Sequence, residues 1–515
     1  MRRRILGGAI LLVWLAMVGW QVRREYFQPE LARLAEAALS LAPGIHFYTL
    51  TMGARTVGQA SSRLDTVPDG FELEDLMVLE LPALGQTGVA VARTRVKLSP
   101  SLVMETFEFS LDSDVGRFEA SGILRPDTTL EVTIVSAGSE QHLSFRLSRP
   151  PILSNIVPIR LAMGEGWEVG DRHRLQVFDP TTLSMRTVEV RVLDFDTLFV
   201  TDSVTLDDAG RWSPAHTDSI PAWKIVEVFG GIQIESWVDE DGRILRSSSP
   251  LGFSMEKTEY ELARQAQEDA RLTALSPIDD DVILSTAVRS NVDLENVEAF
   301  EELRFRLIGV DLSGFQLDGG RQELRGDTLI VRRANCAALD PGYRLPYSFM
   351  DLREVLEPEP LIQSDDPRIV EHARRITAWR SEWRQDPKRV ALELTRSVYG
   401  MLEKSITFSI PNAVQVLETR QGDCNEHTVL YIALARALGL PARTAVGLVY
   451  LNGSFFYHAW PEVWLDEWVA VDPTFGQYPA DASHIRFVTG GLAQQVEIVR
   501  LIGNLEIEVL ELEAP

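Results

Sequence analysis

One cysteine, one histidine and one aspartate follow each other in an order that suits acyl chemistry through a thiolate. Cys424 comes directly after Gly422-Asp423 and opens a run of apolar residues with helical spacing. A thiol in the first turn of a helix faces unpaired N–H groups and the positive end of the helix dipole, which favours the thiolate. The same N–H groups can stabilise an oxyanion when a carbonyl is attacked. We therefore expect Cys424 to act as a nucleophile.

His458 and Asp472 follow this helix on predicted β-strands. The strands are expected at 443–451, 455–464 and 467–472. His458 and Asp472 are equally distant from Leu465, so a hairpin centred there places them about opposite one another on one face. An aspartate beside a histidine fixes the imidazole tautomer and supports the imidazolium. The predicted catalytic residues are Cys424 as nucleophile, His458 as base and later acid, and Asp472 as the residue that orients His458.

Other residues compete for these roles. His427 lies one turn after Cys424 and is a rival base, although it leans along the same helix rather than across a cleft. Asp466 is the alternative to Asp472, which would then only form a turn before a proline. The sequence predicts no cofactor. It also predicts no metal site, because the acidic run at 279–281 lacks the glycine and the spaced acceptors of a calcium loop.

The elements that must position these residues are helices followed by strands. Two helices are expected at 365–383 and 387–404, each behind an aspartate that can cap it and a proline that suits its first turn. The helix that begins at Cys424 runs to Leu440. Helices followed by a β-meander predict an α+β domain, which we place at 350–515.

The motifs around these residues resemble the transglutaminase-like superfamily, a branch of the papain-type thiol folds. They are Gly422-Asp423-Cys424, a helix that ends in ALARALGLPAR, His458-Ala459-Trp460-Pro461-Glu462-Val463 and Val471-Asp472-Pro473-Thr474. The segment 475–485 is similar to a tail seen in bacterial members. The resemblance covers about 365–488 and implies acyl transfer or amide hydrolysis, with Cys424, His458 and Asp472 as the triad. Nothing in the sequence matches the extra domains or calcium sites of animal transglutaminases, so calcium dependence is not implied.

The longer part of the chain before this domain has β-sheet patterning. A helix is expected at 28–41, and from 45 to 246 short runs alternate apolar and polar residues between turns. This pattern predicts a large antiparallel domain at 28–265, built as an open barrel or a sandwich, and a smaller β module at 270–345. The large domain is similar to periplasmic β folds of the lipoprotein-carrier type. One face of its sheet can hold an apolar ligand or a protein partner, and a plain scaffold is the alternative.

The segment 1–27 is expected to anchor the chain in a membrane. Three arginines precede an apolar run of roughly 16 residues, close to the roughly 20 that span hydrocarbon, and the flanking arginines can snorkel. The arginine balance favours a cytoplasmic N-terminus. The bulk of the chain would then be extracytoplasmic, and periplasmic in a Gram-negative cell. A cleaved signal peptide is the alternative.

The net charge limits the classes of partner that the chain can bind. The net charge of −25 argues against nucleic acid, because phosphate binding needs a basic surface. Two functions stay open, and cell-wall peptide cleavage is a third possibility. The first is acyl transfer or amide hydrolysis through a thioester on Cys424, on a protein or peptide outside the cytoplasm. The second is a non-catalytic envelope binding or assembly protein, in which the β domains bind and the thiol fold is a scaffold.

Overall fold

The computed structural model describes residues 30–83, 86–114, 116–164, 166–229, 232–250, 252–273, 283, 286–378, 385–407 and 409–513. The anchor expected at 1–27 and the acidic run at 279–281 lie outside these residues. No helix among the described residues is long and apolar enough to cross a membrane.

A single antiparallel sheet of 14 strands forms the N-terminal region after helix α2 (Glu30–Ala37). Its strands are β1 (Gly44–Met52), β2 (Arg55–Val67), β3 (Gly70–Ala83), β4 (Gln86–Leu98), β5 (Met104–Ser113), β6 (Gly116–Leu124), β7 (Thr129–Ser136), β8 (Ser139–Arg146), β9 (Arg172–Asp179), β10 (Ser184–Leu206), β11 (Trp212–Phe229), β12 (Ile232–Val238), β13 (Ile244–Ser248) and β14 (Phe253–Thr258). β1 pairs with β14, which joins the meander β1–β8 to the meander β9–β14. The β-rich region predicted from the alternating pattern is therefore present.

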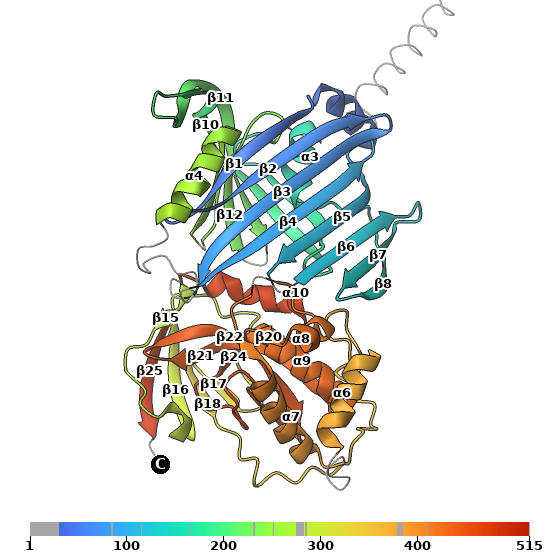
Figure 1. Cartoon of the computed structure of the whole chain (residues 1–515), viewed down its shortest axis with the longest axis vertical. Coiled ribbons are helices and arrows are strands. Elements are labelled where there is room, and N and C mark those ends of the chain that lie inside the picture. The colour runs from blue at the N-terminus through green and yellow to red at the C-terminus, as the bar shows by residue number, and fades with distance from the viewer. Residues whose placement is uncertain are drawn as a thin grey trace, which may run out of the picture.

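The two halves of this sheet bury their apolar faces against each other. Phe178 on β9 lies 5.4 Å from Phe107 on β5 and 5.7 Å from Phe145 on β8, measured between ring centroids. Helix α3 (Val157–Gly164) adds its apolar side chains to the same core. Helix α4 (Tyr260–Thr273) packs on β1 and β2 and leads out of the sheet (Figure 1). Because alternate residues of each strand face this core, apolar and polar residues alternate along these strands in the sequence.

The segment expected as a separate β module shares its sheet and its core with the end of the chain. Strands β16 (Glu302–Ile308), β17 (Gln322–Arg325) and β18 (Thr328–Arg332) form a four-stranded sheet with β25 (Glu506–Glu513). The Phe305 ring packs edge-on against Phe455 at 5.7 Å. The boundary at 345 therefore does not separate two cores, because long-range pairing joins this segment to the C-terminal domain.

The C-terminal domain packs helices against a second sheet. Its helices are α6 (Pro367–Thr377), α7 (Pro387–Met401), α8 (Ala413–Thr419), α9 (Cys424–Ala437) and α10 (Leu492–Gln495), and η4 (Val496–Leu501) is a 3-10 helix. Its strands are β15 (Val288–Arg289), β21 (Ala442–Leu451), β22 (Ser454–Trp464), β23 (Trp468–Ala470) and β24 (Ile485–Thr489), with β19 (Glu403–Lys404) paired to β20 (Gln421–Gly422). Asp366 and Asp386 cap α6 and α7 as predicted.

Helix α9 is the centre of this domain. It packs on α6, α7 and α8 on one side and on β21 and β22 on the other, and almost all of its side chains are buried. The sheet and the C-terminal domain meet near the ends of β7 and β8. There Ser136 donates to Gln415 at 3.2 Å, and Arg368 donates to the carbonyl of Ala137 at 3.2 Å. α10 lies at this boundary (Figure 1).

Candidate active site

Cys424 is fixed by the cap of the helix that it begins. The amide of Asn425 donates to Asp423 Oδ1 at 2.8 Å, and the amide of Asp423 donates to Glu426 Oε2 at 3.0 Å, which completes a capping box. A side chain at Gly422 would meet Glu426, because an added Cβ would lie 2.2 Å from Glu426 Cβ. The sequence Gly-Asp-Cys thus sets where α9 starts and places the thiol in its first turn.

The electrostatics of Cys424 differ from the sequence-based expectation. The thiol is half-buried, and burial is the main reason that its pKa lies well above the ordinary value. The negative charge of Asp423 raises the pKa further, whereas the backbone amide of Ala459 lowers it. Burial and Asp423 therefore oppose the thiolate that the helix N-terminus favours. The thiol must lose its proton to a base during the reaction.

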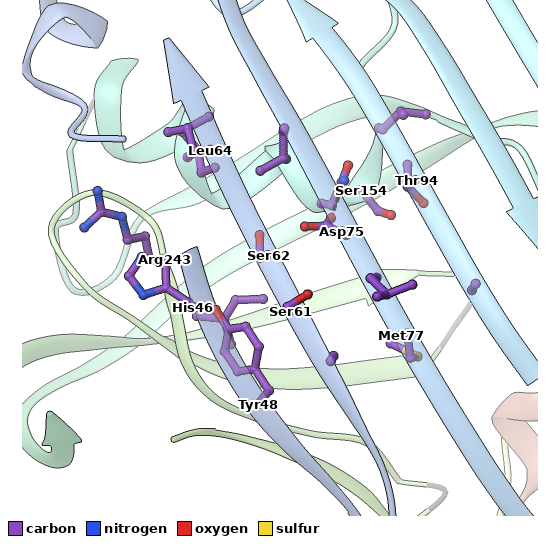
Figure 2. A pocket seen from close by; sticks show the side chains of 18 of the residues that line it. His46, Tyr48, Ser61, Ser62, Leu64, Asp75, Met77, Thr94, Ser154 and Arg243 are labelled. Carbon is purple, nitrogen blue, oxygen red and sulfur yellow. Dashed lines mark hydrogen bonds between the residues drawn. The ribbon is translucent and has the colours of Figure 1, made fainter. Parts of the chain in front are cut away.

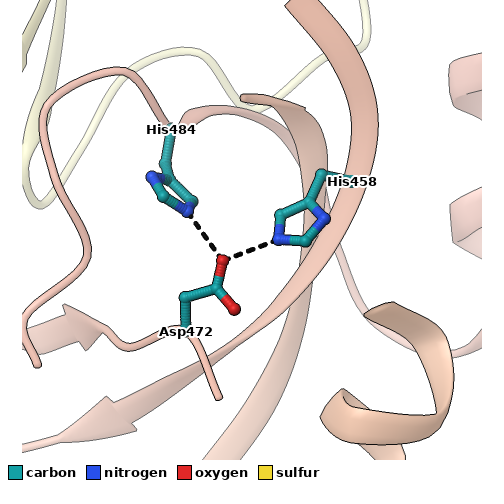
Figure 3. A group of neighbouring side chains, drawn as sticks. All are labelled: His458, Asp472 and His484. Carbon is teal, nitrogen blue, oxygen red and sulfur yellow. Dashed lines mark hydrogen bonds and ion pairs between the residues drawn. The ribbon is translucent and has the colours of Figure 1, made fainter. Parts of the chain in front are cut away.

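His458 and Asp472 are brought together as predicted. His458 Nε2 lies 2.7 Å from Asp472 Oδ2, and both side chains are buried (Figure 3). The imidazole is stacked with Phe475 at 5.0 Å and with Trp460 at 6.0 Å between ring centroids, and these contacts hold its ring plane. Because Nε2 is engaged with Asp472, Nδ1 is the nitrogen left to exchange a proton with a substrate or a thiol.

The hairpin register differs from the predicted one. β22 and β23 pair around Asp466, which takes a left-handed backbone conformation with φ of 67°, and not around Leu465. The ladder ends at Ala470, so Asp472 lies just beyond it and reaches His458 with its side chain. The proximity of the pair was therefore right although the register was not.

Asp472 is completely buried and has donors on both carboxylate oxygens. Oδ1 accepts from the amides of Thr474 at 2.7 Å and Phe475 at 3.1 Å, and Oδ2 accepts from His458 and His484. Burial alone would raise the pKa of Asp472, but the charge and hydrogen bond of His458, together with His484, hold it well below its usual range. The carboxylate stays ionised and can orient an imidazole.

His484 is a member of this cluster that the sequence reasoning missed. Its Nε2 lies 3.0 Å from Asp472 Oδ2 and its Nδ1 lies 3.1 Å from Asp481 Oδ1 (Figure 3). Burial alone would lower the pKa of His484, but Asp481 and Asp472 raise it to about 9. The ring is thus an imidazolium at neutral pH and donates from both nitrogens. The signal available in the sequence was the tail 475–485, which contains both Asp481 and His484.

The loop that carries His484 is held from a distant part of the chain. The Arg321 guanidinium donates to the carbonyls of Ala480, at 3.2 Å, and Asp481. Gln322 Oε1 accepts from the amide of Arg486 at 2.5 Å, and its amide group donates back to the Arg486 carbonyl at 2.9 Å. The segment before the thiol domain therefore positions part of the site.

The rival residues occupy other surroundings. His427 Nδ1 lies 2.7 Å from the carbonyl of Asp423, and burial lowers the pKa of this imidazole. Asp466 is exposed and accepts from the amide of Gly342 at 2.7 Å. Within the described residues, no hydrogen bond joins the Cys424 sulfur to His458; the sulfur lies against the amide of Ala459, the next residue along β22. A proton transfer therefore needs the closer approach that a bound substrate can bring about.

The cluster also has the composition of a metal site. One ligand atom from each of His458, Asp472 and His484 lies within 4.8 Å of the others. Both nitrogens that face Asp472 are hydrogen-bonded to it, so a cation would have to replace their protons. The arrangement as it stands is a hydrogen-bond relay. Cys336, the second cysteine, is not part of this cluster; it is buried beside Tyr478, and burial raises the pKa of its thiol.

One family model and two solved structures are similar to parts of this chain. Residues 368–473 match the family model of the transglutaminase-like superfamily. A candidate cysteine protease from Cytophaga hutchinsonii is similar at 18% identity, with a TM-score of 0.26, over 41% of this chain and 81% of that protein. The periplasmic domain of TgpA from Pseudomonas aeruginosa, bound to ethylmercury, is similar at 16% identity, with a TM-score of 0.24, over 37% of this chain and 89% of that one. No curated protein matches the chain. Residues 368–473 are therefore a domain of the transglutaminase-like superfamily.

Proposed function

We propose that the C-terminal domain catalyses acyl transfer or amide hydrolysis through a thioester on Cys424, on a protein or peptide substrate. The observation that carries the proposal is the buried His458–Asp472 pair, joined at 2.7 Å, with His458 on the strand whose next residue, Ala459, contacts the Cys424 thiol. A nucleophile at a helix start, a base and an orienting carboxylate are the parts that covalent acyl chemistry needs.

In the proposed mechanism His458 acts as a general base, because burial raises the pKa of the thiol. Nδ1 takes the proton while the Cys424 sulfur attacks the carbonyl carbon, and Asp472 supports the imidazolium that results. Amide N–H groups at the start of α9 stabilise the oxyanion. His458 then gives its proton to the departing amine, which leaves a thioester. Water resolves the thioester to an acid, and a second amine resolves it to a new amide.

The reactivity of the thiol tests this proposal. In a Cys336→Ser background Cys424 is the only thiol, since the chain has two cysteines. Because burial raises the pKa of the thiol, its labelling by iodoacetamide depends on a base, and we expect His458→Ala to slow the labelling of Cys424 roughly 100-fold relative to wild type. Equal labelling rates in wild type and His458→Ala contradict the enzyme. A Cys424→Ser, Cys336-containing chain gives the rate of the buried control thiol.

Substrate and outcome are tested together. Wild type and Cys424→Ala are incubated with mixed envelope proteins and, separately, with peptidoglycan fragments, and the products are read by mass for cleavage and for cross-links. Products that form only when Cys424 is present identify the substrate. A product mass increased by one water indicates hydrolysis of the amide, and a mass that shows one amine replaced by another indicates transfer. Identical product sets from the two chains would refute catalysis on these substrates.

A pocket in the sheet favours a second function, the binding of an apolar ligand. A cavity of about 350 Å³ lies between β1–β4 and α3, and Figure 2 shows the Tyr48, Asp75 and Met77 side chains around it. Most of the side chains around it are apolar, and Asp75 accepts from Asn155 at 2.6 Å. In this proposal the folded sheet acts as the open barrel or sandwich expected from the sequence, with this cavity as its interior.

Fluorescence measures this binding directly. We expect the apolar dye N-phenyl-1-naphthylamine to bind the full chain and to lose at least tenfold in affinity with Ser62→Phe, which fills the cavity. Ser121→Phe, at an exposed position on β6, is the matched control. Equal dye affinity in the two variants would rule out this cavity as the binding site.

We also propose that the chain acts outside the cytoplasm, anchored by the apolar run at 5–20. The support is the sequence alone: arginines flank this run, and three of them precede it. Protease added to intact spheroplasts should digest residues beyond 30 if this location is right, and protection of these residues would contradict it.

A further inference from the structure

A second cavity lies where the sheet and the transglutaminase-like domain meet. It measures about 320 Å³. One wall comes from the C-terminal domain through α9, β21 and β22, and the other comes from β8 and from the turn between β9 and β10. It therefore exists only because the sheet is docked on the thiol domain.

This cavity reaches the backbone beside the reacting cysteine, because the Cys424 sulfur lies against the amide of Ala459 and Ala459 lines the cavity. Asn425 and Ala459 line it, and they directly follow Cys424 and His458 in the chain. The Thr428 hydroxyl, also in the wall, donates to the carbonyl of Ala459 at 3.0 Å and ties helix to strand. A substrate whose carbonyl lies at Cys424 can place a neighbouring group in this cavity.

The cavity suits an uncharged apolar group. The sheet contributes Leu143, Phe145 and Leu183. Among the described residues that line the cavity, Glu359 is the only charged one, and it is paired with Arg436 at 2.7 Å. A charged substrate group would lose its hydration here without gaining a partner, whereas an aliphatic or aromatic group would gain burial.

Leu183 reaches this wall with its backbone in an unfavourable conformation. Its φ is 52°, in the left-handed region that a branched apolar residue seldom adopts. Glycine or asparagine would relieve that conformation, and such strain gathers at functional positions. The turn thus presents a leucine to the cavity where the backbone alone favours a different residue.

We propose that this cavity binds the apolar side chain of the peptide residue at or next to the acyl group that Cys424 attacks. The inference rests on the proposed function and adds to it a substrate class: peptides with a bulky apolar residue beside the reacting carbonyl. The 14-stranded sheet is then part of the specificity pocket of the enzyme.

Peptidyl chloromethyl ketones test the pocket. The Cys424 sulfur displaces chloride from the methylene carbon and forms a thioether, so each reagent reports how well its side chain is held. We expect reagents with leucine at the first or second position to inactivate the full chain at least about tenfold faster than the all-glycine reagent. Leu183→Asn and Leu143→Ser should each reduce this preference to roughly threefold or less.

Two controls distinguish a failure of the proposed pocket from a failure of the proposed catalysis. Ile123→Ser changes an exposed apolar residue of β6 outside the cavity and should keep the full preference. Iodoacetamide has no side chain to bind, so its rate with Cys424 should be equal in all of these variants.

Each outcome decides one question. Iodoacetamide labelling that depends on His458, together with equal rates for leucine and glycine reagents, overturns the pocket and leaves the catalytic proposal standing. A leucine preference that persists in Leu183→Asn and Leu143→Ser places the binding elsewhere and also overturns the pocket. Labelling that is independent of His458 with every reagent refutes the catalytic proposal itself.

Discussion

The two regions of this molecule bury carboxylates in opposite ways. In the C-terminal domain Asp472 has four donors, the imidazoles of His458 and His484 and the amides of Thr474 and Phe475. In the sheet, Asp75 accepts from Asn155 through Oδ2 and lies beside the Ser62 hydroxyl, while its buried Oδ1 has no donor in full hydrogen-bond geometry. The same residue type is fully satisfied in one region and left with a free acceptor in the other.

The pKa directions follow this difference. Counter-charges and hydrogen bonds hold the pKa of Asp472 low despite its burial, whereas burial raises the pKa of Asp75. A satisfied network fixes side chains for a reaction, and an unsatisfied acceptor in an apolar cavity is free for a ligand donor. The comparison therefore supports chemistry in the C-terminal domain and binding in the sheet.

Asp472→Ala should break the network with the largest effect. It leaves His484 charged and buried without one of its two acceptors, and it removes the acceptor for His458. Removing one partner of a buried charged network costs about 3–5 kcal/mol, so the urea midpoint should fall steeply. Labelling of Cys424 at pH 6 should become as slow as in His458→Ala. A variant as stable as the wild type would mean that the carboxylate is not the hub of the cluster.

His484→Gln should have an intermediate effect with its own pH signature. The pKa of His484 is raised from 6.5 to about 9, so its contribution to stability is complete below pH 6.5 and is lost as the pH rises through 9. That shift corresponds to at most about 3 kcal/mol. Unfolding in urea at pH 6, 7.5 and 9 should show wild type losing stability along this range and the glutamine variant losing much less. Equal pH slopes would show that the imidazolium contributes nothing.

Local signals in the sequence predicted the elements that carry the site. Asp366 and Asp386 stand before prolines and cap α6 and α7, and Gly422-Asp423 marks the start of α9. These features act within one turn of chain, so spacing and residue type suffice.

Long-range contacts account for what the sequence did not predict. The role of His484 depends on Arg321, which holds its loop from about 160 residues away. The strand β25 pairs with β16 across some 200 residues, so the segment 302–332 could not be assigned to the C-terminal domain from its pattern. The pKa of Cys424 depends on burial that only tertiary packing creates.

Asp75→Asn should have the smallest effect and the opposite sign to Asp472→Ala. A carboxyl whose pKa is raised by burial destabilises the fold once the pH exceeds its unfolded value, near 3.8, because the unfolded chain ionises first. Asparagine keeps an oxygen that can accept from Asn155 and brings an N–H that can donate to Asn155 Oδ1, which is buried without a partner. We therefore expect a gain of about 1 kcal/mol at pH 7 and none at pH 4, measured as the shift of the urea midpoint against wild type. A loss of stability at pH 7 would show that the charge of Asp75 is held as firmly as that of Asp472, and the contrast between the two regions would fail.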